Sequence, residues 1–105
     1  MSDAHWLRIY RRLAFFGGYL PQGVVDIQER YVEDYHKLLA ELEHLSGLNL
    51  EDYFIKDQYL KSVKISDYIT RSQTIYSSQR FVDKHILLNK FRALSNYFDQ
   101  KFAEL

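Results

Sequence analysis

Cysteine is absent from the 105-residue chain, proline occurs once and glycine four times. A chain without thiols forms no disulfide, no thiolate metal site and no cysteine nucleophile, and it suits a reducing compartment. The scarcity of proline and glycine leaves long uninterrupted segments, which favours helices. No apolar run approaches the roughly 20 residues that a membrane-spanning helix needs. We therefore expect a cytoplasmic protein without a membrane span.

An excess of charge of either sign is also lacking, since 14 basic side chains balance 14 acidic ones. The charges are nevertheless unevenly distributed. Residues 1–23 carry three Arg and one Asp, residues 24–57 carry three basic and nine acidic groups, and residues 58–105 carry eight basic and four acidic groups, giving segment charges of +2, −6 and +4. This asymmetry indicates either complementarity between the acidic middle and the basic ends or a locally basic face.

Hydrophobic residues make up 47% and charged residues 27% of the chain, which is typical of a globular protein. Its length predicts one domain, residues 1–105. Aromatic residues are abundant, with nine Tyr, seven Phe and one Trp. Tyrosine is favoured on half-buried helix flanks and at protein interfaces, because it combines an apolar ring with a polar tip.

Apolar residues recur at helical spacing in three segments. The clearest segment has Val24, Ile27, Tyr31, Tyr35, Leu38, Leu42 and Leu45 on one face, which predicts a helix over residues 24–46 that ends at Gly47. A first helix is predicted over residues 3–16, where Gly17 and Gly18 end it before a turn at residues 20–23. A last helix is predicted over residues 79–104, with Ser77 or Ser78 as its N-cap. Short helices are expected between 50 and 76.

The resulting fold prediction is all-α, a small bundle of three main helices. Within residues 59–76, strand-favouring runs such as Tyr68–Thr70 compete with a helical spacing of apolar residues, and we favour the helix. A compact chain of this length has a radius of gyration near 13 Å, so helices of roughly 33 and 39 Å must lie side by side. Apolar residues that project beyond the body favour a homodimer.

Two Glu-x-x-His pairs, Glu33 with His36 and Glu41 with His44, are the most suggestive chemical pattern. In di-iron helical proteins such pairs converge from different helices. Here both pairs belong to one predicted helix, roughly 12 Å apart, and lie largely away from its apolar stripe. We therefore predict no metal and no cofactor. The histidines are scattered and no nucleophile motif is present, so we expect no enzyme.

The leading functional prediction is a protein–protein interaction module, such as an adaptor, a regulatory subunit or an inhibitor. Its expected docking surface is the acidic outer face of the central helix, with Glu33, Lys37, Glu41 and His44, which suits a basic partner. The alternative is a nucleic-acid-binding regulator that uses the basic ends of the chain. The phosphate-contacting candidates are Arg8, Arg11, Arg12, Arg71 and Arg80.

Overall fold

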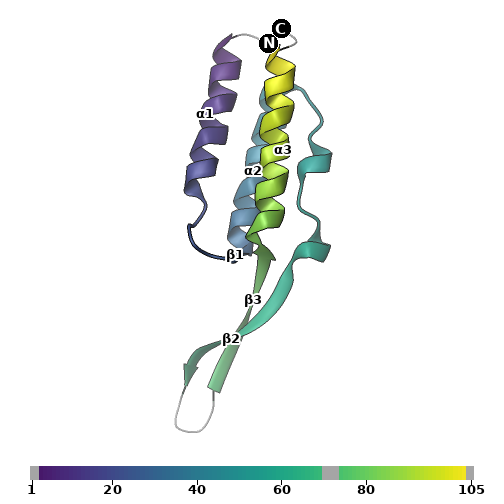
Figure 1. Cartoon of the computed structure of the whole chain (residues 1–105). Coiled ribbons are helices and arrows are strands. Elements are labelled where there is room, and N and C mark those ends of the chain that lie inside the picture. The colour runs from purple at the N-terminus through teal and green to yellow at the C-terminus, as the bar shows by residue number, and fades with distance from the viewer. Residues whose placement is uncertain (1–2, 70–73, 104–105) are drawn as a thin grey trace.

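The computed structural model describes the backbone of residues 3–69 and 74–103, and the side chains of residues 7–63 and 79–103. Three long helices lie side by side, and a β-hairpin extends from one end of them (Figure 1). The elements in chain order are α1 (Asp3–Tyr19), β1 (Asp26–Gln28), α2 (Glu29–Ser46), the 3-10 turns η1 (Glu51–Tyr53) and η2 (Asp57–Tyr59), β2 (Lys61–Ile69), β3 (Thr74–Asp83) and α3 (Lys84–Ala103).

One apolar core joins the three long helices. Its fully or almost fully buried side chains are Ile9, Leu13 and Phe16 from α1, Val32, Tyr35, Leu38, Leu39 and Leu42 from α2, and Leu87, Leu94 and Phe98 from α3. Aromatic rings connect the helices, because Phe16 lies 5.6 Å from Tyr35 and 5.5 Å from Phe91 between ring centroids. The predicted helical spacing is thus confirmed in part: Tyr35, Leu38 and Leu42 of the predicted central stripe are buried, and Val32 and Leu39, which that stripe did not include, are buried as well.

The first helix is longer than predicted, since α1 continues through Gly17 and Gly18 to Tyr19. Neither glycine adopts a positive φ, so neither acts as a helix terminator. Packing outweighs the low helix propensity of glycine here, because Phe16 and Leu20 are both buried on either side of the pair. The chain reverses later, where Gly23 has a φ of 71°.

The central helix starts later than predicted. Residues 24–28 precede α2, and Val24 and Val25 are 43% and 71% exposed. Ile27 belongs to β1 instead, where it pairs with Val82, and both side chains are buried. The predicted end is correct: Gly47 has a φ of 70° and its N–H donates to the Glu43 carbonyl at 2.8 Å.

The expectation of an all-α fold is wrong, because the chain forms a three-stranded antiparallel sheet in the order β1-β3-β2 beside its helices. Lys61 pairs with Phe81 at the base of the hairpin, and Ser66 pairs with Tyr76 further along it. A register shift between Ser66 and Tyr68 leaves Asp67 as an extra residue. The fold is thus mostly helical with a small sheet.

Two further predictions change with the sheet. The last helix begins at Lys84 rather than at residue 79, because residues 79–83 belong to β3. Of the short helices expected between 50 and 76, η1 and η2 are present, whereas residues 61–69 and 74–76 are strand and residues 70–73 lie outside the described residues. The strand-favouring residues of 59–76 therefore outweigh their helical spacing, since each strand supplies the other with hydrogen-bond partners.

The hairpin makes the molecule elongated, with extents of 65 × 23 × 23 Å and a radius of gyration of 17.4 Å in place of the expected 13 Å. β3 runs directly into α3. A ten-residue strand of about 33 Å followed by a twenty-residue helix of about 30 Å accounts for the long dimension. The central and last helices, α2 and α3, do lie side by side as predicted, but the hairpin projects beyond them (Figure 1).

The buried hydroxyl of Tyr35 gives a test of this core. Tyr35 is fully buried, and its hydroxyl has no hydrogen-bond partner among the described residues. Burial raises the pKa of this hydroxyl. An unsatisfied buried hydroxyl costs free energy, so Tyr35→Phe is expected to leave the free energy of unfolding unchanged or to raise it by up to about 1 kcal/mol in urea denaturation.

Tyr10→Phe is the matched control, because the Tyr10 hydroxyl donates to Asp99 at 2.7 Å. Loss of that bond is expected to lower the free energy of unfolding by about 1 kcal/mol. A larger loss for Tyr35→Phe than for Tyr10→Phe would contradict the placement of the Tyr35 hydroxyl.

Candidate functional site

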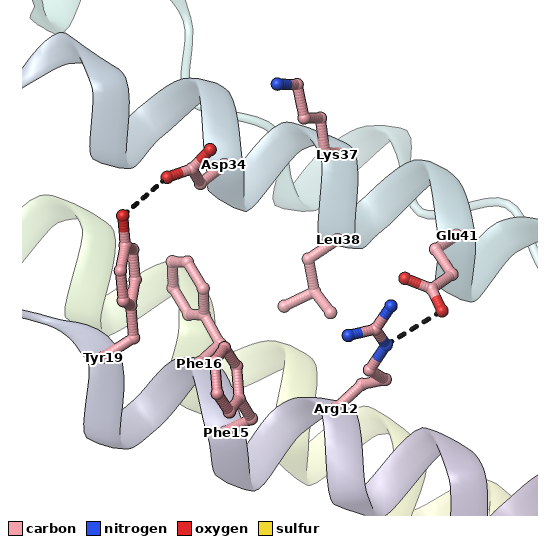
Figure 2. Close-up of a pocket in the computed structure, with 8 residues that line it drawn as sticks. All are labelled: Arg12, Phe15, Phe16, Tyr19, Asp34, Lys37, Leu38 and Glu41. Atoms are coloured by element: carbon pink, nitrogen blue, oxygen red, sulfur yellow. Dashed lines mark hydrogen bonds and ion pairs between the residues drawn. The ribbon is translucent and has the colours of Figure 1, made fainter.

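A groove runs between the neighbouring faces of α1 and α2 (Figure 2). We call it the α1–α2 groove, and it encloses about 230 Å³. Its lining residues are Arg12, Phe15, Phe16, Tyr19, Asp34, Lys37, Leu38 and Glu41. Phe16 and Leu38 are buried and form an apolar floor, whereas the charged residues form the rim.

Two polar contacts join the walls of the groove. Arg12 Nε donates to Glu41 Oε1 at 2.9 Å, and the Tyr19 hydroxyl donates to Asp34 Oδ2 at 2.8 Å. The pKa of Tyr19 is raised mainly by this bond to the Asp34 carboxylate. Because Tyr19 meets Asp34 and Arg12 meets the later Glu41, the two helices run antiparallel (Figure 2).

Phe15 is the most exposed large apolar side chain of the groove. It is 70% exposed, and its ring is stacked on Tyr19 with centroids 6.4 Å apart and an interplanar angle of 11°. Tyr19 itself is 41% exposed, and Leu7, two turns before Phe15 on α1, is 53% exposed. Exposed apolar side chains that adjoin a polar rim are typical of protein-binding surfaces.

The acidic and the basic side chains around the groove differ in whether they have a hydrogen-bond or ion-pair partner. Both lining carboxylates, Asp34 and Glu41, already accept a hydrogen bond across the groove. The lining cation Lys37 is exposed and has no carboxylate partner among the described residues, and the same holds for Arg8 and Arg11 on α1. The charged residues that line the groove, Arg12, Lys37, Asp34 and Glu41, therefore have no net charge, and the cations without a carboxylate partner on α1, Arg8 and Arg11, lie outside the lining.

The structure divides the predicted partner-binding residues. Lys37 and Glu41 line the α1–α2 groove, whereas Glu33 and His44 lie exposed on α2 outside its lining. Glu41 is bonded to Arg12 rather than standing free on an acidic face. Because α1 lies alongside, the surface that looked acidic in the sequence of α2 contains arginines as well.

The predicted phosphate-contacting arginines are not gathered into one surface. Arg8 and Arg11 are exposed on α1, while Arg12 is paired with Glu41. Arg80 lies at the base of the hairpin, where Nε donates to Glu29 Oε2 at 2.7 Å and Nη2 lies 3.5 Å from Asp57 Oδ1. The remaining candidate, Arg71, lies outside the described residues.

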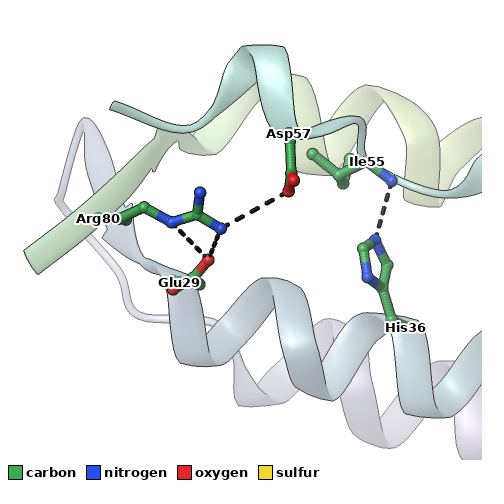
Figure 3. A network of polar contacts seen from close by, with 5 residues as sticks. All are labelled: Glu29, His36, Ile55, Asp57 and Arg80. Atoms are coloured by element: carbon green, nitrogen blue, oxygen red, sulfur yellow. Dashed lines mark hydrogen bonds and ion pairs between the residues drawn. The ribbon is translucent and has the colours of Figure 1, made fainter. Parts of the chain in front are cut away.

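Polar contacts also tie α2 to the segments that follow it (Figure 3). Glu29 at the start of α2 binds Arg80 of β3, and the pKa of Glu29 is lowered chiefly by this hydrogen bond. Further along α2, His36 Nε2 accepts the Ile55 backbone N–H at 3.0 Å. His36 is thus half-buried and structural, which corrects the prediction that it faces solvent.

Sequence reasoning missed Phe15 as a functional candidate. Phe16, the last residue of the predicted first helix, is buried, and its neighbour Phe15 lies 100° away around the helix. That angle was the available signal, because two adjacent phenylalanines in a helix cannot both face the core at its centre. Lys37 belongs to α2, so the sequence of α1 could not predict that Lys37 lines the same groove.

The described residues contain no cluster of three or more His, Asp or Glu arranged to hold a metal ion. None of the helices in the described part of the chain combines the length and apolar character needed to cross a bilayer. Comparisons with protein-family models, with curated proteins and with solved structures find no match to this chain.

The His36 contact predicts a pH dependence of stability. Burial lowers the pKa of His36, and the nearby Asp57 opposes this effect. Since the folded-state pKa lies below the unfolded value of about 6.5, the contribution of neutral His36 is complete above that pH and is lost as the pH falls through the folded-state pKa. A protonated ring no longer accepts the Ile55 N–H.

Urea denaturation of the parent and His36→Gln, from about pH 7.5 to about pH 5, checks this prediction. The parent is expected to lose about 1 kcal/mol or less beyond the loss shown by His36→Gln, which shares all other titrating groups. Parallel pH profiles for the two proteins would show that the His36 contact does not titrate.

Proposed function

We propose that this chain is a noncatalytic protein-interaction module that docks a partner protein through the α1–α2 groove. The observation that carries the proposal is the 70% exposure of Phe15 beside Tyr19, at the rim of a groove with an apolar floor. Covering an exposed phenylalanine gives about 1.5–3 kcal/mol, so a partner gains affinity at this point. Tyr and Arg, which are frequent among energetically dominant interface residues, surround it.

Nucleic-acid binding has weaker support from the same geometry. Arg12 and Arg80 are each engaged by carboxylates of the chain, so their charge is partly neutralised before any phosphate approaches. Asp34 and Glu41 in the groove lining repel a phosphate backbone. We therefore propose a protein rather than a nucleic acid as the partner. The predicted homodimer stays a prediction, which light scattering at high concentration would test.

Site-specific crosslinking tests the proposed function. A photoreactive phenylalanine analogue at position 15, expressed in the source cells, is expected to give a discrete protein adduct that nuclease treatment does not remove. The same analogue at Tyr59, which is 38% exposed on η2, is the control and is expected to give no such adduct. Identical adducts from both positions, or a nuclease-sensitive product, would count against protein docking at the groove.

Phe15→Ser is expected to separate docking from folding. Because Phe15 is 70% exposed, its removal should leave the urea midpoint almost unchanged, within about 0.5 kcal/mol of the parent in free energy of unfolding. Phe16→Ser, one residue further and buried, should destabilise the fold strongly through a cavity and an unsatisfied hydroxyl. Comparable destabilisation by the two variants would mean that Phe15 is part of the core.

A further inference from the structure

We propose that two copies of this chain pair through the outer edge of β2, with Val63 of one copy opposite Val63 of the other. This surface lies outside the α1–α2 groove and does not depend on the docking proposed there. Its setting is the hairpin of β2 and β3, which projects from one end of the helices (Figure 1). The pairing gives the predicted homodimer a defined interface.

β2 is an edge strand. The sheet order is β1-β3-β2, so β3 lies on one side of β2 and no strand of the described chain lies on the other. Lys61, Ser62 and Val63 at its start are exposed, Val63 by 45%. Beyond the three residues of β1 the described sheet has only two strands, and a two-stranded hairpin is marginally stable by itself in water. A further strand at this edge therefore pairs its backbone groups and stabilises the hairpin.

The regular part of β2 is limited at both ends. The strand begins at Lys61, and the register shift between Ser66 and Tyr68 interrupts it. A bulge of this kind bends a strand and disrupts its pairing. Residues 61–66 are therefore the stretch on which a partner strand can form a regular ladder.

Symmetry restricts how two such edges pair. Two antiparallel edge strands of identical chains are related by a two-fold axis perpendicular to the sheet, which keeps each residue on its own face. Directly opposite residues share a face, and successive residues alternate between faces. The axis therefore passes between a residue and its own copy. Within residues 61–66, an axis at Val63 pairs residues 61–65 and an axis at Lys64 pairs residues 62–66, whereas any other axis gives a shorter ladder.

Charge decides between these two registers. An axis at Lys64 places this cation directly opposite its copy, and like charges in that position destabilise a sheet. An axis at Val63 places Lys61 opposite Ile65 of the other copy. It also places Ser62 opposite Lys64, so no two like charges are directly opposed. Because Val63 is 45% exposed, its contact with its own copy removes apolar surface from water.

The segments beside the ladder have complementary charges. Residues 61–79 contain three basic side chains and one acidic side chain, whereas residues 51–57, which precede β2, contain three acidic side chains and one basic side chain. In an antiparallel pair, the hairpin of each copy continues from the ladder toward this acidic segment of the other copy. The Asp57 side chain in that segment is 88% exposed. Opposite charges therefore approach each other at both ends of the ladder and favour a second copy as the occupant.

The other edge of the hairpin is partly occupied. β1 already pairs with residues 81–83 of β3, and Arg80 beside them is bonded to Glu29. Pairing through β2 uses the same edge of both copies, so the assembly closes at two chains. The edge of β2 is therefore the better site for self-association.

Val63→Cys tests the register. Because the chain has no cysteine of its own, an introduced thiol reports a single position. Directly opposite residues of an antiparallel pair have Cα atoms about 4.5–5.5 Å apart, which a disulfide can span. Val63→Cys is therefore expected to form a covalent dimer in a glutathione redox buffer. Lys61→Cys is the matched control, because its two copies would lie about 13 Å apart along the ladder, too far for a disulfide.

Sedimentation velocity tests the interface without a covalent bond. Residues 61–65 of each copy form a small contact, so the dimer is expected to dissociate on dilution, with the transition between about 10 μM and about 1 mM. Val63→Lys places a charge opposite its own copy and is expected to weaken the dimer at least about tenfold. Val25→Lys, at another exposed valine, precedes β1 and is expected to leave the dimer unchanged. Because both valines are exposed, both variants should keep the urea midpoint of the dilute parent.

A monomer at every concentration would overturn the pairing. A dimer that Val63→Lys leaves intact would also overturn it, as would disulfides that form as readily from Lys61→Cys as from Val63→Cys. Phe15→Ser is expected to leave the dimer unchanged, so this pairing and docking at the groove fail independently. A photoadduct from Tyr59 to a second copy of this chain would support the pairing, and its mass distinguishes it from the adduct of a partner protein at position 15.

Discussion

The apolar stripe of α2 is covered from three directions, and the rest of the structure depends on this burial. Tyr35, Leu39 and Leu42 are completely buried by α1, by α3 and by the segment between α2 and the hairpin. That segment has little regular structure, but Leu50 and Ile55 are core residues, and the Ile55 N–H donates to His36. A single helix face thus organises three separate parts of the chain.

The packing of the core also sets the position of the sheet relative to the helices. Ile27 and Val82 pair across β1 and β3, and both side chains are buried. The short strand β1 therefore holds the C-terminal end of β3 against the helices. Arg80 then joins Glu29 at the start of α2 and approaches Asp57 of η2 (Figure 3). Because β3 continues into α3, the position of this C-terminal end of β3 also sets the position at which the last helix begins.

The surface of α1 and α2 shows that the exposure and charge of a face depend on neighbouring elements rather than on one segment. Phe15 and Phe16 are adjacent in sequence, yet one is 70% and the other 5% exposed, since the helix places them 100° apart. On α2, Glu41 looked like part of an acidic face but is paired with Arg12. Charges that belong to different helices must be summed over the surface that both helices form.

The sequence by itself determined much of the buried faces of the three long helices and the end of α2. Apolar residues at spacings of three and four identify the buried faces, and Gly47 takes the left-handed conformation that ends a helix. Local periodicity carries this information because each helix closes its hydrogen bonds within itself.

Only the tertiary structure decided the strands and the candidate site. β1 has three residues, too few for a pattern, and it exists because β3 supplies its partners from more than 50 positions away. The residues of the α1–α2 groove come from two helices, and its polar contacts depend on which carboxylates of α2 meet Arg12 and Tyr19. Both features are pairings between distant residues, which a local reading of propensity and spacing does not contain.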